Sequence, residues 1–543
     1  MREIITLQFG QQSNYLASHF WNAQESYFTY GADEESPVDH DVHFRPGIGS
    51  DGTETYMPRT VIYDLKGGFG TLRKINSLYE IDGDPSSSSL WSGQTVIQRQ
   101  QPIEASAYQE SLDSGQAAAE LTTSNVRYWS DFNRVFYHPK SIIQLSEYEL
   151  NSTVMPFEKW HMGEELFASL DKEHDLLDRD LRPFVEEADQ MQGLQIMTGI
   201  DDAWGGFVAK YMERLRDEYG KTPVWVFGAQ EPSRGLPREK RLLKLVNKAR
   251  TLSELNSQAS LVIPLALPDR SLPQNIQLDS SSSWHVSALF AAALESVTLY
   301  TRLRTSDRIY SSNLGNMTDL LNVFGKQTIA NLEMSISETP KPHQNGTNGT
   351  NGTDGETNGL NGRGENVRSL YENGIDLDNE SESGSQKGAA TLDIDLSSPQ
   401  DLNLDSSGRR RRKRHIFSQV IGDRGLQNLE RANDDNDREL REHGMRRRPK
   451  FHNYRSRVAF PIIDSYPKIL RDSYGHPVRE NASVKTVLST DSTVTDKVKA
   501  IRNTVVRSIG LEDRETIGNE LAEIADSYKE GWSSDSDEDD DDE

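Results

Sequence analysis

A glycine and a run of polar residues near the N-terminus have the types and spacing of a phosphate-binding turn. Residues 10–14 read Gly-Gln-Gln-Ser-Asn and lie between an apolar stretch, residues 4–9, and a stretch with helical spacing. A strand that passes through a glycine into a helix leaves backbone N–H groups free, and these groups can hold a phosphate. The candidate nucleotide-binding residues of this turn are Gly10, Gln11, Gln12 and Asn14.

Other motifs for familiar chemistry are incomplete. Gly220-Lys221-Thr222 resembles the end of a conventional phosphate loop, but Leu215 occupies the position of its first glycine. No Gly-x-Ser-x-Gly elbow and no His-Glu-x-x-His motif is present. The chain has no cysteine, which excludes disulfides, thiolate zinc sites and cysteine nucleophiles. We therefore predict no catalytic residues of these kinds.

Residues 39–43 contain side chains that commonly bind metals. Asp39, His40, Asp41 and His43 offer two carboxylates and two imidazoles. No further ligand is evident in the sequence, so we interpret this stretch as a polar loop and predict no metal site.

Periodicity predicts an α/β fold with parallel strands around the candidate turn. Short apolar runs indicate strands at residues 4–9, 61–65, 194–197, 224–227 and 261–267. Helical spacing is found at residues 15–27, 167–188, 203–219, 286–303 and 494–528, with Pro183 expected to kink the second helix. Residues 31–58 are rich in glycine and proline and are expected to form loops. Strands that alternate with helices through short connections favour parallel pairing.

Composition places limits on the environment of the chain. Of 543 residues, 34% are hydrophobic and 27% are charged, so we expect two packed domains and some unpacked segments. No apolar run could cross a bilayer, and the N-terminus lacks the pattern of a signal peptide or presequence. The net charge of −25 repels polyanions, so direct nucleic-acid binding is not expected. These features predict a soluble or peripheral protein.

Two segments have strongly biased composition. Residues 336–415 are rich in Asn, Gly and Ser and are expected to be a disordered insertion. The insertion ends in a basic run that consists of Arg409, Arg410, Arg411, Arg412, Lys413 and Arg414. Nuclear import, an anionic lipid surface, RNA and a simple flank that balances nearby acid are all compatible with this run. Residues 535–543 carry eight carboxylates in nine positions and predict a solvated acidic tail.

Several segments resemble tubulin in sequence and in order. These are residues 1–21, 56–65, 160–166 and 193–197. More specifically, the chain resembles the Misato family of tubulin-like proteins, through residues 40–45, 58–59, 64–67, 69–72, 460–461 and 465–467. The resemblance implies a tubulin-like domain at residues 1–335, the insertion at 336–415, an α+β C-terminal region at 416–530 and a tail at 531–543.

The chain departs from tubulin where tubulin holds nucleotide. Tubulin's glycine-rich phosphate loop is replaced by residues 198–206, in which Asp201, Asp202 and Trp204 lie where phosphates would bind. Two like charges about 4 Å apart repel by roughly 4 kcal/mol at an effective dielectric constant near 20. Lys66 replaces an acidic residue, and no counterpart of tubulin's catalytic acidic loop is found.

The resemblance therefore implies a nucleotide site that is weak or vestigial, and no GTPase activity. Asn322 is aligned with a guanine-contacting asparagine of tubulin. The residues that the resemblance assigns to the site are Gly10, Gln11, Gln12, Asn14, Asp64, Lys66, Gly205 and Gly206. No cofactor is predicted, although GTP stays open.

For fungal Misato proteins, the resemblance implies a role in mitochondrial distribution and inheritance of mitochondrial DNA. We expect a non-enzymatic protein on the cytosolic face of the mitochondrial outer membrane, with a cytoplasmic pool. Its partners would be proteins at that surface, cytoskeletal or chaperonin components included. Two alternatives stay open: a GTP-binding, polymer-forming protein of the tubulin superfamily, and a chaperonin-linked factor in tubulin biogenesis.

Overall fold

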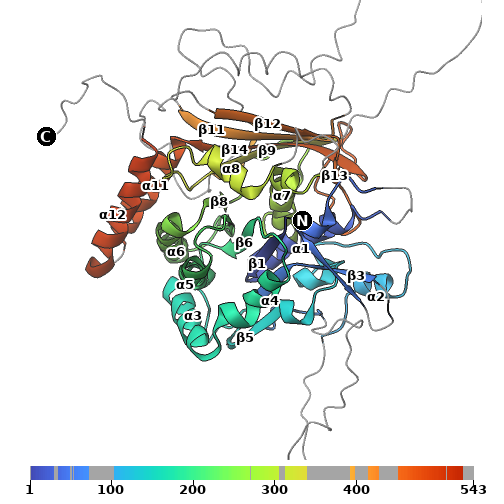
Figure 1. Ribbon diagram of the computed structural model, residues 1–543, viewed down its shortest axis with the longest axis horizontal. Helices are drawn as coiled ribbons and strands as arrows, with labels where there is room; N and C mark the ends of the chain where they lie inside the picture. Colours follow the sequence, from blue (N-terminus) through green and yellow to red (C-terminus); the bar gives the residue numbers. More distant parts are fainter. Residues whose placement is uncertain are drawn as a thin grey trace, which may run out of the picture.

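The computed structural model describes residues 2–29, 35–48, 52, 54–72, 103–268, 271–304, 312–338, 392–397, 414–426, 450–508 and 510–529. This part of the chain forms two larger β-sheets, one two-stranded sheet and the helices packed on them; Figure 1 shows their arrangement.

The first sheet has six strands in the order β5-β4-β1-β6-β7-β8, and every neighbouring pair is parallel. Its strands are β1 (Ile4–Phe9), β4 (Thr60–Lys66), β5 (Ile142–Glu149), β6 (Gly193–Gly199), β7 (Val224–Ala229) and β8 (Leu261–Leu265). β1, β6, β7 and β8 are buried along their whole length, which is why most of their residues are apolar, with Thr6, Gln8, Gln195 and Thr198 as the buried polar exceptions. The predicted α/β fold with a mainly parallel sheet is confirmed.

Helices cover both faces of this sheet. On one face lie α1 (Gln11–Glu25) and α7 (Ser283–Thr298), and on the other lie α3 (Trp160–His174), α5 (Ala203–Glu218) and α6 (Arg238–Gln258). The helix expected at residues 167–188 does not break at Pro183: α3 ends at His174, where Asp175 adopts a left-handed conformation with a φ of 46°, and a π-helical turn (Leu177–Leu181) then leads directly into α4 (Arg182–Glu186). Pro183 lies in the first turn of α4, where its missing N–H is not needed.

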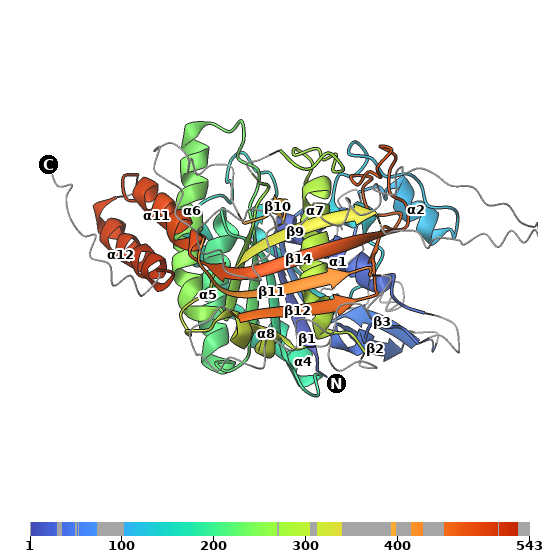
Figure 2. The ribbon, with the colours of Figure 1, turned by 90° about the horizontal axis from the view of Figure 1, so that it is seen from above.

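The second sheet packs on the far side of α7. Its main path has the order β10-β9-β14-β11-β12, and β13 also pairs with β14. Figure 2 shows this sheet from above, with α7 and the parallel sheet beneath it. Its strands are β9 (Asn331–Glu338), β10 (Ile394–Asp395), β11 (Ile416–Arg424), β12 (Lys450–Ser456), β13 (Phe460–Pro461) and β14 (Asn481–Asp491). The helix α8 (Leu314–Leu321) packs on β11. The helices α11 (Thr493–Val505) and α12 (Leu511–Ser527) pack on each other and on α6.

Two sequence-based expectations need correction. Residues 31–58 do not form only loops, because β2 (Phe44–Ile48) and β3 (Glu54–Pro58) pair as an antiparallel hairpin. The sequence does not predict this hairpin because Pro46 and Gly47 interrupt the alternation of apolar and polar residues. A two-stranded ribbon tolerates both residues. β10 and part of β9 lie within the range expected to be disordered, most of which falls outside the described residues. The shorter elements are α2 (Ala107–Asp113) and the 3-10 turns His40–Val42, Trp129–Phe132, Pro139–Ser141 and Leu299–Thr301.

A fully buried charge cluster joins α7 and the end of α1 to the second sheet. Glu295 of α7 accepts a hydrogen bond from Arg302 Nη2 at 2.7 Å and also pairs with Arg424 of β11. Arg424 Nη2 donates to the Tyr27 hydroxyl at 2.7 Å, which extends the cluster to the end of α1. Burial alone would raise the pKa of Glu295, but the guanidinium groups of Arg424 and Arg302 lower it below its usual value. The carboxylate is therefore ionised and holds two arginines.

Candidate functional site

The candidate site lies at the carboxyl edge of the parallel sheet. Because all six strands are parallel, the segments that follow β1, β4 and β6 meet at this edge. They bring together Gly10, Asp64 and the stretch from Asp201 to Trp204. The sequence-based placement of these residues at one site is supported by their contacts.

Asp64 is the centre of a buried hydrogen-bond network. Its Oδ2 accepts from Gln11 Nε2 at 2.6 Å and from Asn14 Nδ2 at 2.7 Å, and its Oδ1 accepts from the Leu65 N–H at 2.8 Å. Burial raises the pKa of Asp64 to about 7, although these three donors act in the opposite direction. The network fixes the start of α1 on the end of β4. It also occupies the amides that a nucleotide would otherwise use.

The Trp204 side chain fills the space in front of Gly10. A Cβ atom at position 10 would lie 2.3 Å from Trp204 Nε1, and Gly10 has a φ of +82°. Trp204 is itself buried, and its indole packs on Phe157 and Phe207 at ring distances of 5.3 and 5.6 Å. The glycine that could admit a phosphate therefore admits an indole.

Asp201 and Asp202 precede α5 and are held by protein groups. Lys244 Nζ lies 3.1 Å from Asp201 Oδ2, and Asp202 Oδ1 accepts from the Trp204 N–H at 2.9 Å as the N-cap of α5. Burial raises the pKa of Asp201, and burial together with the Asp201 charge raises the pKa of Asp202 to about 7. Asp202 caps α5, and a carboxylate that is ionised at either position repels an anion.

Gly205 and Gly206 have a packing role that their sequence position did not reveal. A Cβ at Gly206 would lie 1.9 Å from the Trp160 carbonyl oxygen, and a Cβ at Gly205 would lie 2.1 Å from Thr251 Oγ1. These contacts let α5 approach α3 and α6 closely. Both glycines face neighbouring helices, so the prediction that they cradle phosphate is not supported by their placement.

Lys66, Gln12 and Asn322 are not among the hydrogen-bond partners of Asp64 within the described residues. Lys66 is exposed at the end of β4, and Gln12 makes no side-chain hydrogen bond to a residue within the described ranges. Asn322 follows α8, where its Oδ1 accepts from the Gln327 N–H at 2.8 Å, so it is a turn residue.

Arg414, the last residue of the basic run, is part of the fold. Its Nη1 lies 2.6 Å from Glu333 Oε1 and its Nη2 lies 2.8 Å from Asp491 Oδ2. These carboxylates belong to β9 and β14, so Arg414 anchors the start of β11. The prediction of Arg414 as an interaction residue is therefore not supported by its placement. Arg409, Arg410, Arg411, Arg412 and Lys413 lie outside the described residues.

The polar stretch at residues 39–43 does not gather its side chains around one point. Asp39 Oδ1 accepts from the Asp41 N–H, and His40 stacks on Phe28 at 3.7 Å. His43 is buried against Phe20. Among the described residues, no group of three or more His, Asp or Glu side chains could hold a metal. In the same part of the chain, no helix has the length and hydrophobicity needed to span a membrane.

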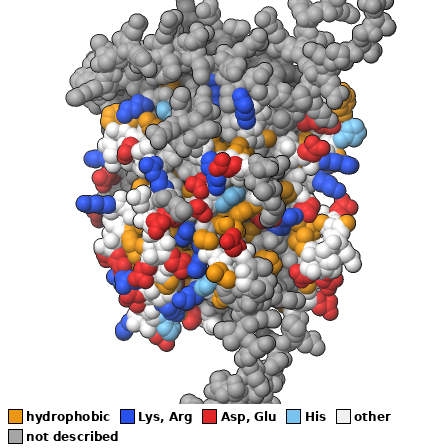
Figure 3. Space-filling model, turned by 45° about the vertical axis from the view of Figure 1, so that its right-hand side comes forward, with side chains coloured by type: hydrophobic (Ala, Val, Ile, Leu, Met, Phe, Trp, Pro, Cys, Tyr) orange, Lys and Arg blue, Asp and Glu red, His pale blue; other side chains and the backbone are white. Residues whose placement is uncertain are grey.

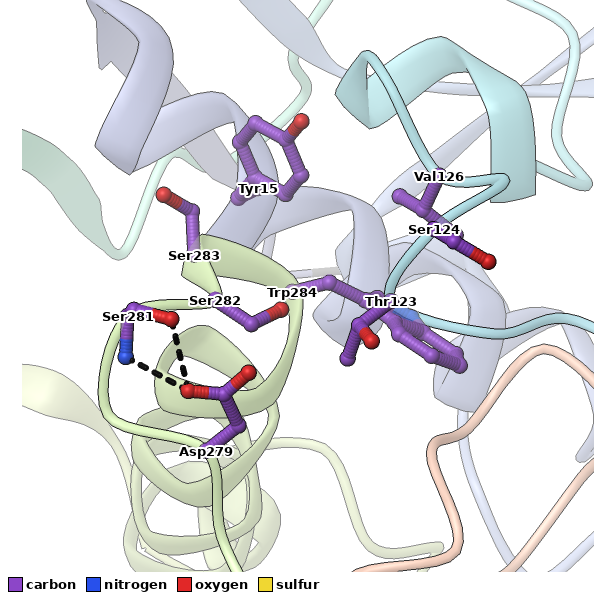
Figure 4. A pocket seen from close by; sticks show the side chains of 9 residues that line it. All are labelled: Tyr15, Thr123, Ser124, Val126, Asp279, Ser281, Ser282, Ser283 and Trp284. Atoms are coloured by element: carbon purple, nitrogen blue, oxygen red, sulfur yellow. Dashed lines mark hydrogen bonds between the residues drawn. The ribbon is translucent and has the colours of Figure 1, made fainter.

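A polar cavity lies beside the candidate site, and the sequence analysis did not predict it. Its volume is about 340 Å³, and Figure 4 shows Tyr15 of α1 and the start of α7 around it. The lining residues are Tyr15, Thr123, Ser124, Val126, Asp279, Ser281, Ser282, Ser283 and Trp284. The run of serines before α7 was the available signal. Asp279 accepts from both the N–H and the hydroxyl of Ser281, at 2.9 and 2.7 Å.

Comparison with known families agrees with this architecture. Residues 2–114 match a family described as Misato Segment II tubulin-like domain, and residues 118–303 match one described as tubulin domain. The first range contains β1 and β4, and the second contains β6 and α5, so the two ranges together include the elements that form the candidate site.

Full-length relatives are found among fungal proteins. Protein dml-1 of Neurospora crassa is 51% identical over 555 residues, and Protein DML1 of Gibberella zeae is 45% identical over 542 residues; each alignment covers 100% of both chains. Protein dml1 of Schizosaccharomyces pombe is 34% identical over 339 residues, which cover 59% of this chain and 69% of the relative. With these relatives, the chain belongs to the Misato family of tubulin-like proteins.

Proposed function

We propose that the chain is a non-enzymatic, tubulin-like protein that acts in the partitioning of mitochondria and the inheritance of mitochondrial DNA. It would act through protein partners on the cytosolic face of the mitochondrial outer membrane, with a cytoplasmic pool. Membership of the Misato family supports the biological role. The loss of a usable phosphate cradle supports the non-enzymatic part.

The position of Trp204 carries the non-enzymatic proposal. The indole lies against Gly10 and provides an N–H donor but no acceptor for the free N–H groups at the start of α1. A phosphate would have to displace a buried aromatic side chain and approach Asp201 and Asp202. Both changes oppose nucleotide binding.

Nucleotide titration by calorimetry tests this proposal. We expect no binding of GTP with magnesium to the unmodified protein, and no GTPase activity above a denatured control. A variant with Asp201, Asp202 and Trp204 changed to glycine restores an open loop and is expected to bind more tightly. Trp204→Phe keeps most of the packing and serves as the matched control. Tight binding or turnover by the unmodified protein would refute the proposal.

The cellular role needs a separate experiment. Depletion of the protein is expected to change mitochondrial distribution and to reduce the inheritance of mitochondrial DNA. A tagged full-length chain is expected to co-localise with mitochondria, with and without residues 409–413. Normal mitochondria after complete depletion would exclude this role and leave the nucleotide result untouched.

A GTP-binding, polymer-forming protein is the second candidate. The observation in its favour is the cavity next to Tyr15, one residue beyond the Asn14 that holds Asp64. This candidate requires Trp204 to move when nucleotide binds. A nucleotide-dependent increase in sedimentation of the unmodified protein would support it.

A further inference from the structure

Two exposed apolar residues lie on a loop at the carboxyl edge of the parallel sheet. Val154 is 88% exposed and Met155 is 53% exposed, between the end of β5 and the start of α3. The Met155 N–H donates to Ser152 Oγ at 3.2 Å, which shapes the loop as a turn. Asn151, at the start of the loop, adopts a left-handed conformation with a φ of 59°. The loop therefore presents apolar side chains to solvent in an ordered conformation.

Three arginines without ion pairs mark the beginning of α6. Arg234, Arg238 and Arg241 are exposed, and none forms an ion pair with a residue inside the described ranges. Cations in the first turn of a helix are unfavourable because the helix dipole places partial positive charge there. The two leucines that follow, Leu242 and Leu243, are only half-buried. Within the described residues, the start of α6 therefore presents three unpaired cations next to two half-buried leucines, with Glu239 as the acidic residue of its first turn.

The loop and the helix are bound to each other. Lys240 Nζ lies 3.1 Å from Glu158 Oε1, and Asn247 Nδ2 donates to the Glu158 carbonyl oxygen at 2.7 Å. The Trp160 N–H donates to Asn247 Oδ1 at 3.1 Å. Residues 154–155 thus belong to the same surface as the start of α6. We call this surface the α6 edge and define it by Val154, Met155, Arg234, Arg238 and Arg241.

We propose that the α6 edge is a binding surface for an anionic lipid membrane. Unpaired arginines attract anionic headgroups, and neighbouring exposed apolar side chains can enter the boundary between headgroups and acyl chains. Acidic and basic side chains are mixed on the face that Figure 3 shows, whereas the three arginines of the α6 edge outnumber Glu239, the acidic residue in the first turn of α6. A mixed surface gives no net attraction to an anionic membrane. The α6 edge has both features that a peripheral membrane contact requires, namely cations for the headgroups and apolar side chains for the acyl boundary.

The chemistry of the α6 edge favours a lipid surface over an acidic peptide. An acidic peptide would pair with the arginines but would leave Val154 and Met155 in water. A membrane satisfies both kinds of side chain together. This inference goes beyond the proposed function, because vesicle binding by the purified protein does not depend on a mitochondrial role.

Vesicle sedimentation with the full-length protein tests the inference. The probes are vesicles of phosphatidylcholine alone and vesicles of phosphatidylcholine with phosphatidylserine. We expect binding to the mixed vesicles only, decreasing as salt is raised. A variant with R234Q, R238Q and R241Q is expected to bind at least tenfold more weakly. A variant with V154S and M155S is expected to bind several-fold more weakly with an unchanged dependence on salt.

The controls separate the α6 edge from the other charged segments. R457Q, R479Q and R507Q remove three exposed arginines of the C-terminal part and are expected to leave binding unchanged. Binding that survives the α6 triple change but is lost when residues 409–413 become glutamine would overturn the inference. Equal binding to both kinds of vesicle would also overturn it. So would binding seen only after removal of residues 530–543, since the tail would then be the natural occupant of this surface.

Discussion

The indole of Trp204 occupies the space that a side chain at residue 10 would need. Trp204 Nε1 lies 2.3 Å from the position that a Cβ atom would have at residue 10. The positive φ of Gly10 turns the chain from β1 into α1 at the same point. The glycine is needed both for this turn and for contact with the tryptophan.

Gly10→Ala is expected to destabilise the protein. A left-handed conformation at a residue other than glycine costs about 1–3 kcal/mol, and the contact with Trp204 adds to this cost. Urea denaturation of the two proteins measures the difference in free energy of unfolding. The same substitution in a Trp204→Gly background is expected to lose only the conformational part. Equal losses in both backgrounds would show that the indole does not restrict residue 10.

Glu295→Gln is expected to cost about 3–5 kcal/mol, because two buried arginines lose their counter-charge. Glu295, Arg302 and Arg424 are all fully buried. Chemical denaturation followed by tryptophan fluorescence is a suitable measurement. Lys210→Met removes a partly exposed cation that pairs with Glu164 and Glu213, and it is expected to cost about 0–1 kcal/mol. Similar effects of the two substitutions would mean that the buried cluster is not required for stability.

The raised pKa of Asp64 predicts a dependence of stability on pH. The folded protein keeps this proton up to a pH of about 7, whereas the unfolded chain loses it near pH 4. The folded state therefore binds more protons between these values, and the stability contributed by Asp64 falls as pH rises through this window. The advantage of the wild type over Asp64→Asn should shrink from pH 4 to pH 7. Asp217→Asn, at an exposed position of α5, controls for the substitution. A constant difference across this range would contradict the prediction.

The lowered pKa of His43 predicts a loss of stability as pH falls, which is the opposite of the contribution from Asp64. It is buried, neither ring nitrogen has a hydrogen-bond partner among the described residues, and burial lowers its pKa well below the usual value. The unfolded chain gains a proton below about pH 6.5 while the folded protein does not, so stability falls as pH falls. His43→Phe keeps the contacts with Phe20 and Trp21 and should lose about 2 kcal/mol less than the wild type between pH 7.5 and 5.0. His161→Phe, on the surface of α3, is the control, and an equal pH effect in all three proteins would refute this prediction.

The central strands of the parallel sheet could be predicted because they are buried on both faces. β6 and β7 are mostly apolar, so their positions follow from the sequence within a few residues. The second sheet could not be predicted in this way. β14 alternates Val484 and Thr486 with Ser483 and Lys485, and its partners β9 and β11 are far apart along the chain.

The candidate site could be predicted in part. Gly10, Gln11 and Asn14 lie together because a strand-to-helix turn is a local feature, and Asp64 joins them because β4 is the parallel neighbour of β1. The role of Gly206 could not be predicted, because it depends on Trp160 in another helix. A glycine next to a phosphate and a glycine between two helices look alike in a sequence, and only the neighbour distinguishes them.

The antiparallel pairing of β9 with β10 affects how well the fold tolerates changes in the length of the segment between them. Met334 lies opposite Ile394, and the Leu392 N–H donates to Glu333 Oε2 at 2.9 Å, so the described residues before position 339 and after position 391 are held together. The entropy cost of closing a loop grows only with the logarithm of its length. Gene changes that lengthen or shorten this segment should therefore be nearly neutral for folding. The same property makes it a natural place to splice in a fluorescent reporter.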